Sequence, residues 1–397
     1  MKILVICQYY YPEPFRVSDI CETLQQKGHE VTVLTGLPNY PEGRVLDGYR
    51  HGNKRSETIN GVKVIRSFEI GRGNSHLKLF INYLSFVVSA SLKALFIKEE
   101  FDAIFVNQLS PIMMGIPAMV YKRIHHKKIL LYCLDLWPAS LAAGGIKEGA
   151  MIYKLFFLIS KWIYKSADMI LVTSSMFKDY FKDTLGLAAE NIQHLPQYAE
   201  DLFEQKADIP QSNGKFNLVF AGNIGDLQSV ETIIKAANEL RDYSEISFHI
   251  VGDGSKLSEC KRLSDDFKLV NIVFHGRRPV SEMPFFYGIA DAMLITLKDN
   301  KTLSYTLPGK VQSYLAAGKP IIGAIYGEAR NVIQESNCGL CCDSEDYKGL
   351  ATIILQFYNS DKKRNMAESA RRYYFENYSK EKFMSKLEDA LISLEDL

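Results

Sequence analysis

The chain has 397 residues, of which 47% are hydrophobic and 23% charged, a composition typical of globular proteins and a length that suits two domains. Its formal net charge of +1 excludes the strongly basic class of nucleic-acid-binding proteins. The charge is uneven: residues 1–195 carry 23 Lys and Arg against 17 Asp and Glu, a net +6, and the rest carries 24 against 29, a net −5. A mildly basic first half is compatible with an anionic membrane surface.

Short β-branched segments alternate with helical patterns in the first half. The strand candidates are residues 2–6, 30–35, 62–67, 103–107, 128–134 and 169–174. This alternation predicts a parallel sheet with crossover helices on both faces, and we expect no hairpins between its strands. The opening segment MKILVICQ has too short an apolar run for a signal peptide and fits a first strand.

The loop after the first predicted strand, QYYYPEPFRVSD, contains no glycine, so the dinucleotide-binding pattern Gly-x-Gly-x-x-Gly is absent there. Arg16, Ser18 and Asp19 open the helix that follows. Ser18 or Asp19 caps that helix in one interpretation. In the other, the loop contacts an acceptor substrate.

Two apolar segments of the first half, Phe80–Ile97 and residues 151–168, contain no uninterrupted run of the 18 or more apolar residues that a spanning helix needs. They fit either core helices or helices that lie on a membrane face. In the second segment, Lys154, Lys161 and Lys165 recur at roughly helical spacing. Such a helix can bury its apolar face among lipid headgroups and keep its lysines outside.

Asp135 and Trp137, in LLYCLDLWPASL, come just after a predicted buried strand. A carboxylate that accepts from hydroxyls and an indole that stacks on a ring suit a sugar. The alternative is that Asp135 only caps the turn before Pro138.

A second βα array begins after a polar, proline-containing linker at 196–214, with strand candidates at 216–222, 247–254, 271–276, 291–297, 319–325 and 339–343. We therefore expect an α/β fold with two Rossmann-like parallel-sheet domains facing a central cleft. The first spans residues 1–197 and the second 198–377. The final helix, about 378–395, has no strand after it, so the segment 378–397 can join either domain.

Three glycine turns in the second half share one predicted sheet edge. They contain Gly222 in FAGNIG, Gly252 in VGDGSKL and Gly309 in TLPGKVQSYLAAGKPIIG, and Arg277, Arg278 and Lys310 lie near them. Each turn alone is typical of αβ geometry. Together, free helix N–H groups and cations indicate a diphosphate site, although no P-loop sequence is present.

The seven cysteines follow no disulfide framework, which indicates a reducing compartment. Cys338, Cys341 and Cys342 form the one cluster. No second cysteine pair or histidine follows nearby, so we expect a buried strand end and no metal site.

The motifs taken together resemble the GT-B glycosyltransferases of family 4, retaining enzymes that use nucleotide sugars. FAGNIGDLQSVETIIKAA resembles the family's glycine turn and helix, HLPQYAEDLF its interdomain linker, and LPGKVQSYLAAGKPIIG its C-terminal signature. CQYYYPEPFRVSDI, GLPNYPEG and DLWPAS are similar to the subgroup that builds O-antigen, capsule and colanic-acid repeat units, including N-acetyl-fucosamine transferases. The resemblance covers nearly the whole chain.

The resemblance implies metal-independent, retaining sugar transfer from a nucleotide donor, with UDP expected, to a polyprenyl-diphosphate-linked saccharide. It implies no cofactor, no nucleic-acid partner, and a peripheral place on the cytoplasmic face of the cell membrane. The site residues it implies are Asp135, Arg277 and Lys310 for catalysis; Gly222, Asn223, Gln228, Gly252, Arg277, Tyr305, Gly309, Lys310, Val311, Gln312 and Ser313 for the donor; and Arg16, Ser18, Asp19 and Trp137 for the acceptor.

The sequence also departs from the family pattern. Tyr305 and Ser313 stand where the family has two glutamates, so contacts to the donor sugar and the ribose must be remade. Asn223 and Gln228 stand where it commonly has cations, which makes Lys310 and Arg277 the expected replacements. Leu134 stands in place of a frequent histidine. These departures keep two alternatives open: a sugar-nucleotide epimerase-like isomerase and a non-catalytic binding subunit.

Overall fold

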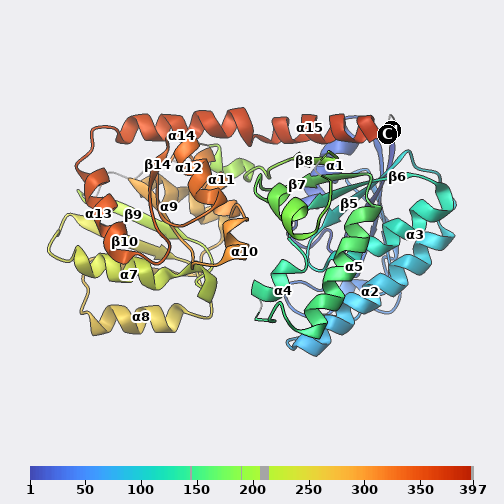
Figure 1. Ribbon diagram of the computed structural model, residues 1–397, viewed down its shortest axis with the longest axis horizontal. Coiled ribbons are helices and arrows are strands. Elements are labelled where there is room, and N and C mark those ends of the chain that lie inside the picture. Colours follow the sequence, from blue (N-terminus) through green and yellow to red (C-terminus); the bar gives the residue numbers. More distant parts are fainter. Residues whose placement is uncertain (144, 189, 206–213, 395–397) are drawn as a thin grey trace. The chain divides into compact units, whose positions relative to one another are not determined.

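The computed structural model describes residues 1–143, 145–188, 190–205 and 214–394, and the chain divides into two compact units (Figure 1). Unit 1 comprises Met1–Leu195 and Met384–Leu397, and unit 2 comprises Pro196–Phe383. Of the predicted linker, residues 206–213 lie outside the described part of the chain, as do residues 395–397 of the final segment.

Unit 1 is built on an eight-stranded sheet with the order β3-β4-β2-β1-β5-β6-β7-β8. Its strands are β1 (Lys2–Ile6), β2 (Glu30–Thr35), β3 (Ser56–Ile59), β4 (Val62–Arg66), β5 (Ala103–Gln108), β6 (Lys128–Cys133), β7 (Met169–Val172) and β8 (Ile192–His194). All pairs except one are parallel, so the predicted parallel sheet is confirmed. Strands β3 and β8 are additions that the sequence analysis did not predict.

The expectation that no hairpins occur is wrong for β3 and β4, which pair antiparallel with Ile59 opposite Val62. The two strands are joined by Asn60 and Gly61, whose φ angles are 47° and 86°. An Asn-Gly pair tolerates positive φ at both central turn positions, which is what a tight two-residue hairpin requires. The hairpin forms the outer edge of the sheet.

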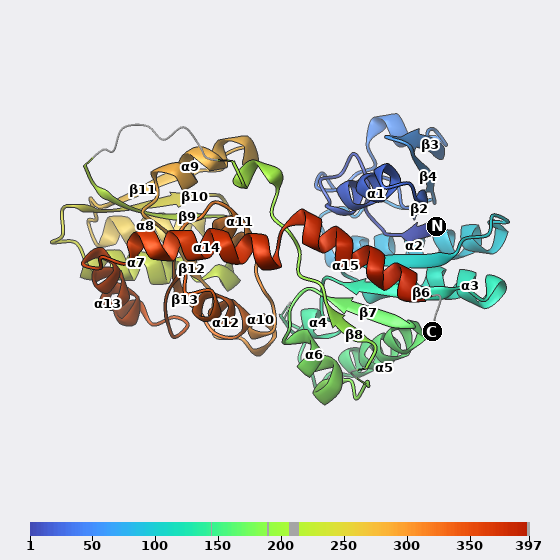
Figure 2. The same ribbon diagram turned by 90° about the horizontal axis from the view of Figure 1, so that it is seen from above.

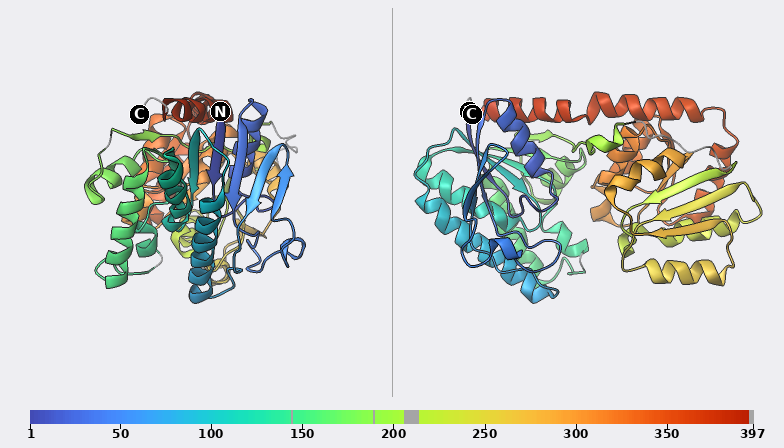
Figure 3. Two further views of the ribbon diagram at one scale, coloured as in Figure 1. Left: turned by 90° about the vertical axis from the view of Figure 1, so that its right-hand side faces the viewer. Right: turned by 180° about the vertical axis from the view of Figure 1, so that it is seen from behind.

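Helices α2, α3 and α5 cover one face of the unit 1 sheet, and Figure 3 shows them beside one another. The helices of unit 1 are α1 (Val17–Gln26), α2 (His76–Phe96), α3 (Ile116–His125), α4 (Ala139–Ala143), α5 (Met151–Ser166), α6 (Phe177–Asp179) and α15 (Lys380–Ser393), with the division between the units falling inside α15. Glu388 of α15 bonds to Lys27 and, at 3.0 Å, to His29 Nε2. Leu387 and Leu391 of α15 are fully buried.

Unit 2 contains a parallel six-stranded sheet with the order β11-β10-β9-β12-β13-β14, the doubly wound arrangement that the alternating pattern predicted. Its strands are β9 (Phe216–Ala221), β10 (Ile246–Val251), β11 (Ile272–Gly276), β12 (Ala292–Thr296), β13 (Ile321–Ala324) and β14 (Gly339–Cys342). Its helices are α7 (Val230–Glu239), α8 (Leu257–Asp266), α9 (Met283–Ile289), α10 (Lys301–Ser304), α11 (Gly309–Ala316), α12 (Glu328–Glu335), α13 (Tyr347–Tyr358) and α14 (Lys363–Asn377).

Two hydrophobic cores lie on the two faces of this second sheet, whose strands and helices Figure 2 shows from above. Side chains of α7, α8 and α13 pack on one face. Side chains of α9, α11, α12 and α14 pack on the other. Since all six strands are parallel, the turns that follow β9, β10 and β11 lie at the same edge, together with the start of the segment that leads from β12 to α11.

Candidate functional site

The glycine turns after β9 and β10 touch each other at the carboxyl edge of the unit 2 sheet. Gly222 and Gly252 have φ angles of +150° and +141°. A Cβ on Gly252 would lie 1.8 Å from the carbonyl oxygen of Gly222, so only glycine fits there. The two turns therefore form a rim in which Gly222 and Gly252 are half-buried and have no side chains to cover their backbone.

The N-terminus of α11 lies against this rim. Pro308 is its N-cap residue, and Gly309 and Lys310 are its first two helical residues. Among the described residues neither the Gly309 amide nor the Lys310 amide has a hydrogen-bond acceptor, as is usual for the first turn of a helix. The amide of Val311 already donates to Pro308 O at 2.9 Å, so the predicted role of that amide in phosphate binding is not supported.

Gln312 and Ser313 maintain the same turn. The side-chain amide nitrogen of Gln312, which is 3% exposed, donates to Pro308 O (2.9 Å) and Gly309 O (3.1 Å). Ser313 Oγ donates to Gly309 O at 3.3 Å. Both side chains thus hydrogen-bond within the first turn of α11, and Gln312 is too buried to contact a ribose.

Lys310 points its ammonium group into the rim. Nζ is buried, lies 4.1 Å from the centroid of the Phe220 ring, and would be 3.1 Å from a Cβ on Gly222. In the described part of the chain it has neither a carboxylate partner nor a hydrogen-bond acceptor. Burial lowers the pKa of Lys310 to about 8. A buried cation without a counter-charge, beside free helix N–H groups, is a site prepared for an anion.

Tyr314 holds α11 against β9, and the sequence analysis missed this residue. Its buried hydroxyl donates to Ala221 O (3.2 Å) and accepts from Ala221 N (3.3 Å), directly before the Gly222 turn. No sequence motif marks it. The only signal was a tyrosine on the apolar face of a helix, which usually packs in the core.

Asn223 and Gln228 interact with each other instead of presenting free polar groups. Gln228 Oε1 accepts from Asn223 Nδ2 (3.0 Å) and from the Gly225 amide (3.2 Å). Asn223 is exposed. It lies close to the rim, because a Cβ on Gly254 would be 2.4 Å from the carbonyl oxygen of Ile224 and 2.8 Å from Asn223 Oδ1. Gln228 therefore shapes the turn.

Two further predicted donor residues lie on other segments of unit 2. Arg277 follows the edge strand β11, is exposed, and makes no polar contact within the described ranges. Tyr305 ends α10 and is half-buried. The structure thus groups Gly222, Gly252 and Lys310, and Arg277 directly follows Gly276, whose carbonyl accepts from the Gly252 amide at 2.9 Å.

In unit 1, Asp135 follows β6 and lies at the carboxyl edge of that sheet. Ser110 Oγ donates to Asp135 Oδ2, and Trp137 Nε1 donates to Ser110 Oγ at 2.7 Å. Burial raises the pKa of Asp135, opposed by the hydrogen bonds from Ser110 and Ser140. Burial raises the pKa of the neighbouring Tyr83, and the charge of Asp135 adds to this rise.

Trp137 does not present a ring for sugar stacking. It is 5% exposed and packs edge-on against Phe156, with ring centroids 5.7 Å apart. Its backbone amide donates to the hydroxyl of Tyr164 at 3.2 Å. The predicted stacking role is thus replaced by a structural one, in which the indole N–H orients Ser110 beside Asp135.

The predicted acceptor residues of the first loop are half-buried. Ser18 Oγ accepts from the Tyr11 amide at 3.1 Å, which fixes the preceding loop. The N-cap of α1 is Arg16, which makes no side-chain capping bond, and Asp19 lies in the first turn. Neither Ser18 nor Asp19 is the N-cap, so that interpretation is wrong.

Helices α2 and α5 expose long apolar faces. Among the described residues, α2 is the one helix that is long and apolar enough to cross a membrane, by length and composition only, although it contains no uninterrupted apolar run of 18 residues. The buried residues of α2 are Asn82, Phe86, Ala90 and Ala94, which lie on one stripe that faces the rest of unit 1. The exposed large apolar residues are Leu77, Phe80, Ile81, Leu84, Val88, Leu92, Leu95 and Phe96 on α2, and Met151, Ile152, Leu155, Leu158 and Trp162 on α5.

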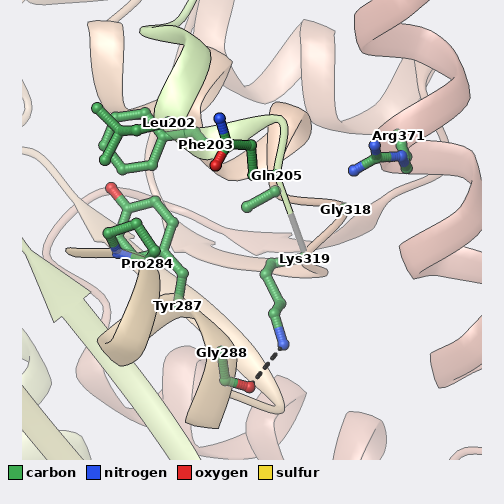
Figure 4. Close-up of a pocket in the computed structure, with 10 residues that line it drawn as sticks. Leu202, Phe203, Gln205, Pro284, Tyr287, Gly288, Gly318, Lys319 and Arg371 are labelled. Carbon is green, nitrogen blue, oxygen red and sulfur yellow. Dashed lines mark hydrogen bonds between the residues drawn. The ribbon is translucent and has the colours of Figure 1, made fainter. Parts of the chain in front are cut away.

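A pocket of about 320 Å³ lies elsewhere in unit 2 (Figure 4). It is lined by Leu202, Phe203, Tyr287 and Arg371, and by Lys319, whose Nζ donates to Gly288 O at 3.0 Å. Lys319 precedes β13, so the pocket lies toward the amino ends of the strands, away from the glycine rim. Its cations are already bonded to backbone carbonyls.

No group of three or more His, Cys, Asp or Glu side chains that could hold a metal ion occurs among the described residues. Cys338 and Cys342 are buried and Cys341 is half-buried, around strand β14, as the sequence predicted.

Comparison with known proteins assigns both halves of the chain to sugar-transferring enzymes. Residues 16–197 match the family model "Glycosyltransferase Family 4", and residues 202–373 match "Glycosyl transferases group 1". The probable glycosyltransferase WbjE of Pseudomonas aeruginosa is 28% identical over 57% of this chain and 59% of its own length. The putative colanic acid biosynthesis glycosyl transferase WcaI of Escherichia coli is 24% identical over 90% of this chain and 92% of its own.

Solved structures agree on the fold. The Anabaena protein HepE, crystallised in complex with UDP, superposes with a TM-score of 0.74 at 14% identity, covering 99% of this chain and 100% of that one. The two doubly wound units and the two family matches lead to one conclusion: the chain belongs to the GT-B glycosyltransferases.

Proposed function

We propose that the protein is a retaining glycosyltransferase that takes its sugar from a UDP-linked donor bound by unit 2. The observation that carries the proposal is the buried, unpartnered ammonium of Lys310 at the Gly222 rim. A diphosphate would supply the missing counter-charge and accept from the Gly309 and Lys310 amides. HepE, which shares the fold, was crystallised with UDP.

The same groups account for catalysis. The diphosphate gains negative charge as the glycosidic bond breaks, and in this proposal Lys310 and the α11 N–H groups stabilise that charge. An acceptor hydroxyl then attacks the face that the diphosphate leaves, and the departing phosphate takes its proton. This route needs neither a protein nucleophile, a metal nor a separate cofactor. Asp135 binds hydroxyls of the saccharide, and Arg277 adds positive charge at the donor edge.

Calorimetry with UDP tests the donor site. We expect wild-type protein to bind UDP and Lys310→Met to bind it about ten- to a hundredfold more weakly, the usual worth of a hydrogen bond to a charged group. Lys348→Met removes an exposed lysine of α13 and serves as the matched control. Equal affinities in all three proteins would refute the donor site.

The acceptor in this proposal is a polyprenyl-diphosphate-linked saccharide of surface-polysaccharide synthesis, reached at the cytoplasmic face of the membrane. The support is the surface of α2 and α5, whose 37 residues include no Asp or Glu and carry Lys78, Lys93, Lys154, Lys161 and Lys165. Thirteen large apolar side chains of these helices are exposed. An apolar face bordered only by cations complements an anionic lipid surface.

Vesicle co-sedimentation tests the membrane proposal. We expect binding to vesicles that contain phosphatidylglycerol and weaker binding to pure phosphatidylcholine. Changing Lys154, Lys161 and Lys165 together to Glu should abolish the difference. The same change at Lys2, Lys63 and Lys182, which are exposed lysines of unit 1 outside the two helices, should not. Equal loss in both triple variants would show only a general charge effect and refute the proposed face.

The two alternatives give different outcomes. An epimerase-like isomerase would convert a UDP-sugar without any acceptor, whereas a transferase would not. A binding subunit would bind UDP and show no sugar transfer to a lipid extract that contains lipid-linked saccharides.

A further inference from the structure

Glu69 lies at the centre of a buried polar network in unit 1. It comes from the segment after β4 and is 1% exposed. Its Oε1 accepts from Gln8 Nε2 (2.8 Å) and from Asn82 Nδ2 (2.6 Å). Gln8 follows β1 and Asn82 lies on α2, so one carboxyl oxygen joins three segments that are distant in sequence.

The second oxygen of Glu69 has no such support. Oε2 is buried and receives no hydrogen bond from the described residues, and no Lys or Arg among them pairs with Glu69. It occupies the space beside Gly36, where a Cβ would lie 1.7 Å from it. An ionised carboxylate here would leave a charged, buried oxygen without a donor, which is costly. The geometry therefore favours the neutral carboxyl.

A second buried carboxylate, Glu13, extends the network to the loop after β2. Its Oε1 accepts from the amides of Asn39 (2.8 Å) and Tyr40 (2.7 Å). Asn39 Oδ1 in turn accepts from the Arg72 amide at 3.1 Å. The loops after β1, β2 and β4 are thus held together through side chains that solvent does not reach.

The groups around Glu69 oppose its ionisation. Burial raises the pKa of Glu69 to about 8, and the nearby charge of Glu13 adds to this, while the side chains of Gln8, Asn82 and Asn39 act the other way. Burial likewise raises the pKa of Glu13 to about 7. Tyr9 and Tyr83 also face Glu69, and both are neutral near pH 7. Two cations are near. Arg72 acts on these two tyrosines, and the buried Arg66, which is paired with Glu57, opposes the rise in the pKa of Glu13.

We infer that Glu69 is a positioning residue for the acceptor: in its neutral form it holds the loops 8–16, 36–43 and 68–73 in the arrangement that receives the saccharide. These loops lie at the carboxyl ends of β1, β2 and β4, where open α/β sheets bind ligands. Ionisation of Glu69 beside Glu13 releases them. The inference rests on the proposed function only in naming the acceptor as the ligand of these loops.

Hydrogen exchange of the wild-type chain is the first test. After correction for the intrinsic effect of pH on exchange, protection of the Asn39, Tyr40 and Arg72 amides should fall about tenfold between pH 8 and pH 9, as the ionised fraction rises. Glu69→Gln keeps an oxygen for Gln8 and Asn82 and cannot ionise, so it should retain its protection at pH 9. Asp291→Asn, which alters a carboxylate of raised pKa in unit 2, should behave as wild type.

A pH-independent wild type, or a Glu69→Gln variant with the same alkaline loss, overturns the inference. If the variant does not fold, the wild-type series alone decides. A transfer assay with a lipid extract as acceptor source adds a readout of positioning: KM for the acceptor should rise between pH 8 and pH 9 in wild type and not in Glu69→Gln. UDP affinity at pH 7 should be equal in both, so failure of the donor site and failure of this inference can be told apart.

Discussion

The hydroxyl of Tyr314 makes two hydrogen bonds to one residue, donating to the carbonyl of Ala221 at 3.2 Å and accepting from its amide at 3.3 Å. Ala221 ends β9 and Gly222 begins the rim. Tyr314 therefore fixes the distance between the strand end and the helix whose first turn carries Lys310.

We expect Tyr314→Phe to destabilise the fold by about 1 kcal/mol, because two buried backbone groups lose a partner while the ring still packs. UDP affinity should fall as well, since α11 is no longer tied to β9. Denaturant unfolding and calorimetry measure the two effects. Tyr287→Phe, which changes the ring that packs edge-on against Tyr314, is the control, and its UDP affinity should stay at the wild-type level. An unaltered UDP affinity in Tyr314→Phe would show that this tether is dispensable.

Binding of UDP should involve proton uptake by Lys310. Its pKa of about 8 in the free protein should rise when a diphosphate binds, so at pH 8 about half a proton is taken up for each UDP bound. Calorimetry in two buffers of different ionisation enthalpy measures that number. Affinity should decline as the pH rises above 8. Lys310→Met should remove the proton uptake that Lys310 causes and the loss of affinity above pH 8. If the variant keeps both, Lys310 does not bind the diphosphate.

Gly252→Ala should destabilise unit 2 by about 3 kcal/mol, since the added methyl would lie 1.8 Å from Gly222 O on a backbone with φ of +141°. Gly48→Ala, where nothing lies within 4 Å of the new methyl, should have little effect. Thermal unfolding distinguishes them. Comparable unfolding temperatures for both variants would mean that the rim can rearrange.

The free energy of unfolding should decrease as the pH rises from about 4.5 to 8. In this range the unfolded chain has lost the Glu69 proton while the folded chain keeps it, because the folded pKa is about 8. Below this range both states are protonated, and above it both are ionised. Denaturant unfolding at pH 5, 6, 7 and 8 should show a shallower decrease for Glu69→Gln. Parallel slopes would show that Glu69 titrates normally in the folded state.

Much of the fold could be predicted from hydrophobic patterning alone. Every strand predicted from a β-branched run is present. Runs such as KILVI and FNLVFA are buried on both faces of a sheet, and this burial does not depend on the conformation of the loops. The β3–β4 hairpin was missed although its Asn60-Gly61 turn is a local signal. Strand β8, of three residues, is too short to leave a pattern.

The site was less predictable, for physical reasons that differ between residues. The glycines and Lys310 were found because three glycine turns and several cations share one predicted sheet edge, although each turn alone is typical of αβ geometry. Trp137 was misjudged because a sequence shows that an indole is near a strand end and not which way its ring faces. Glu69 and Asn82 were missed as a pair because they lie on different elements, and their hydrogen bond exists only in the folded chain.

The division inside α15 gives the two units different histories during synthesis. Unit 2 is one continuous segment and can fold as soon as Phe383 has left the ribosome. Unit 1 needs Leu387, Glu388 and Leu391, which are made almost 200 residues after the rest of it. Unit 1 is therefore synthesised first but completes its fold last. The apolar surface that Leu387 and Leu391 later cover stays exposed to aggregation while unit 2 is translated.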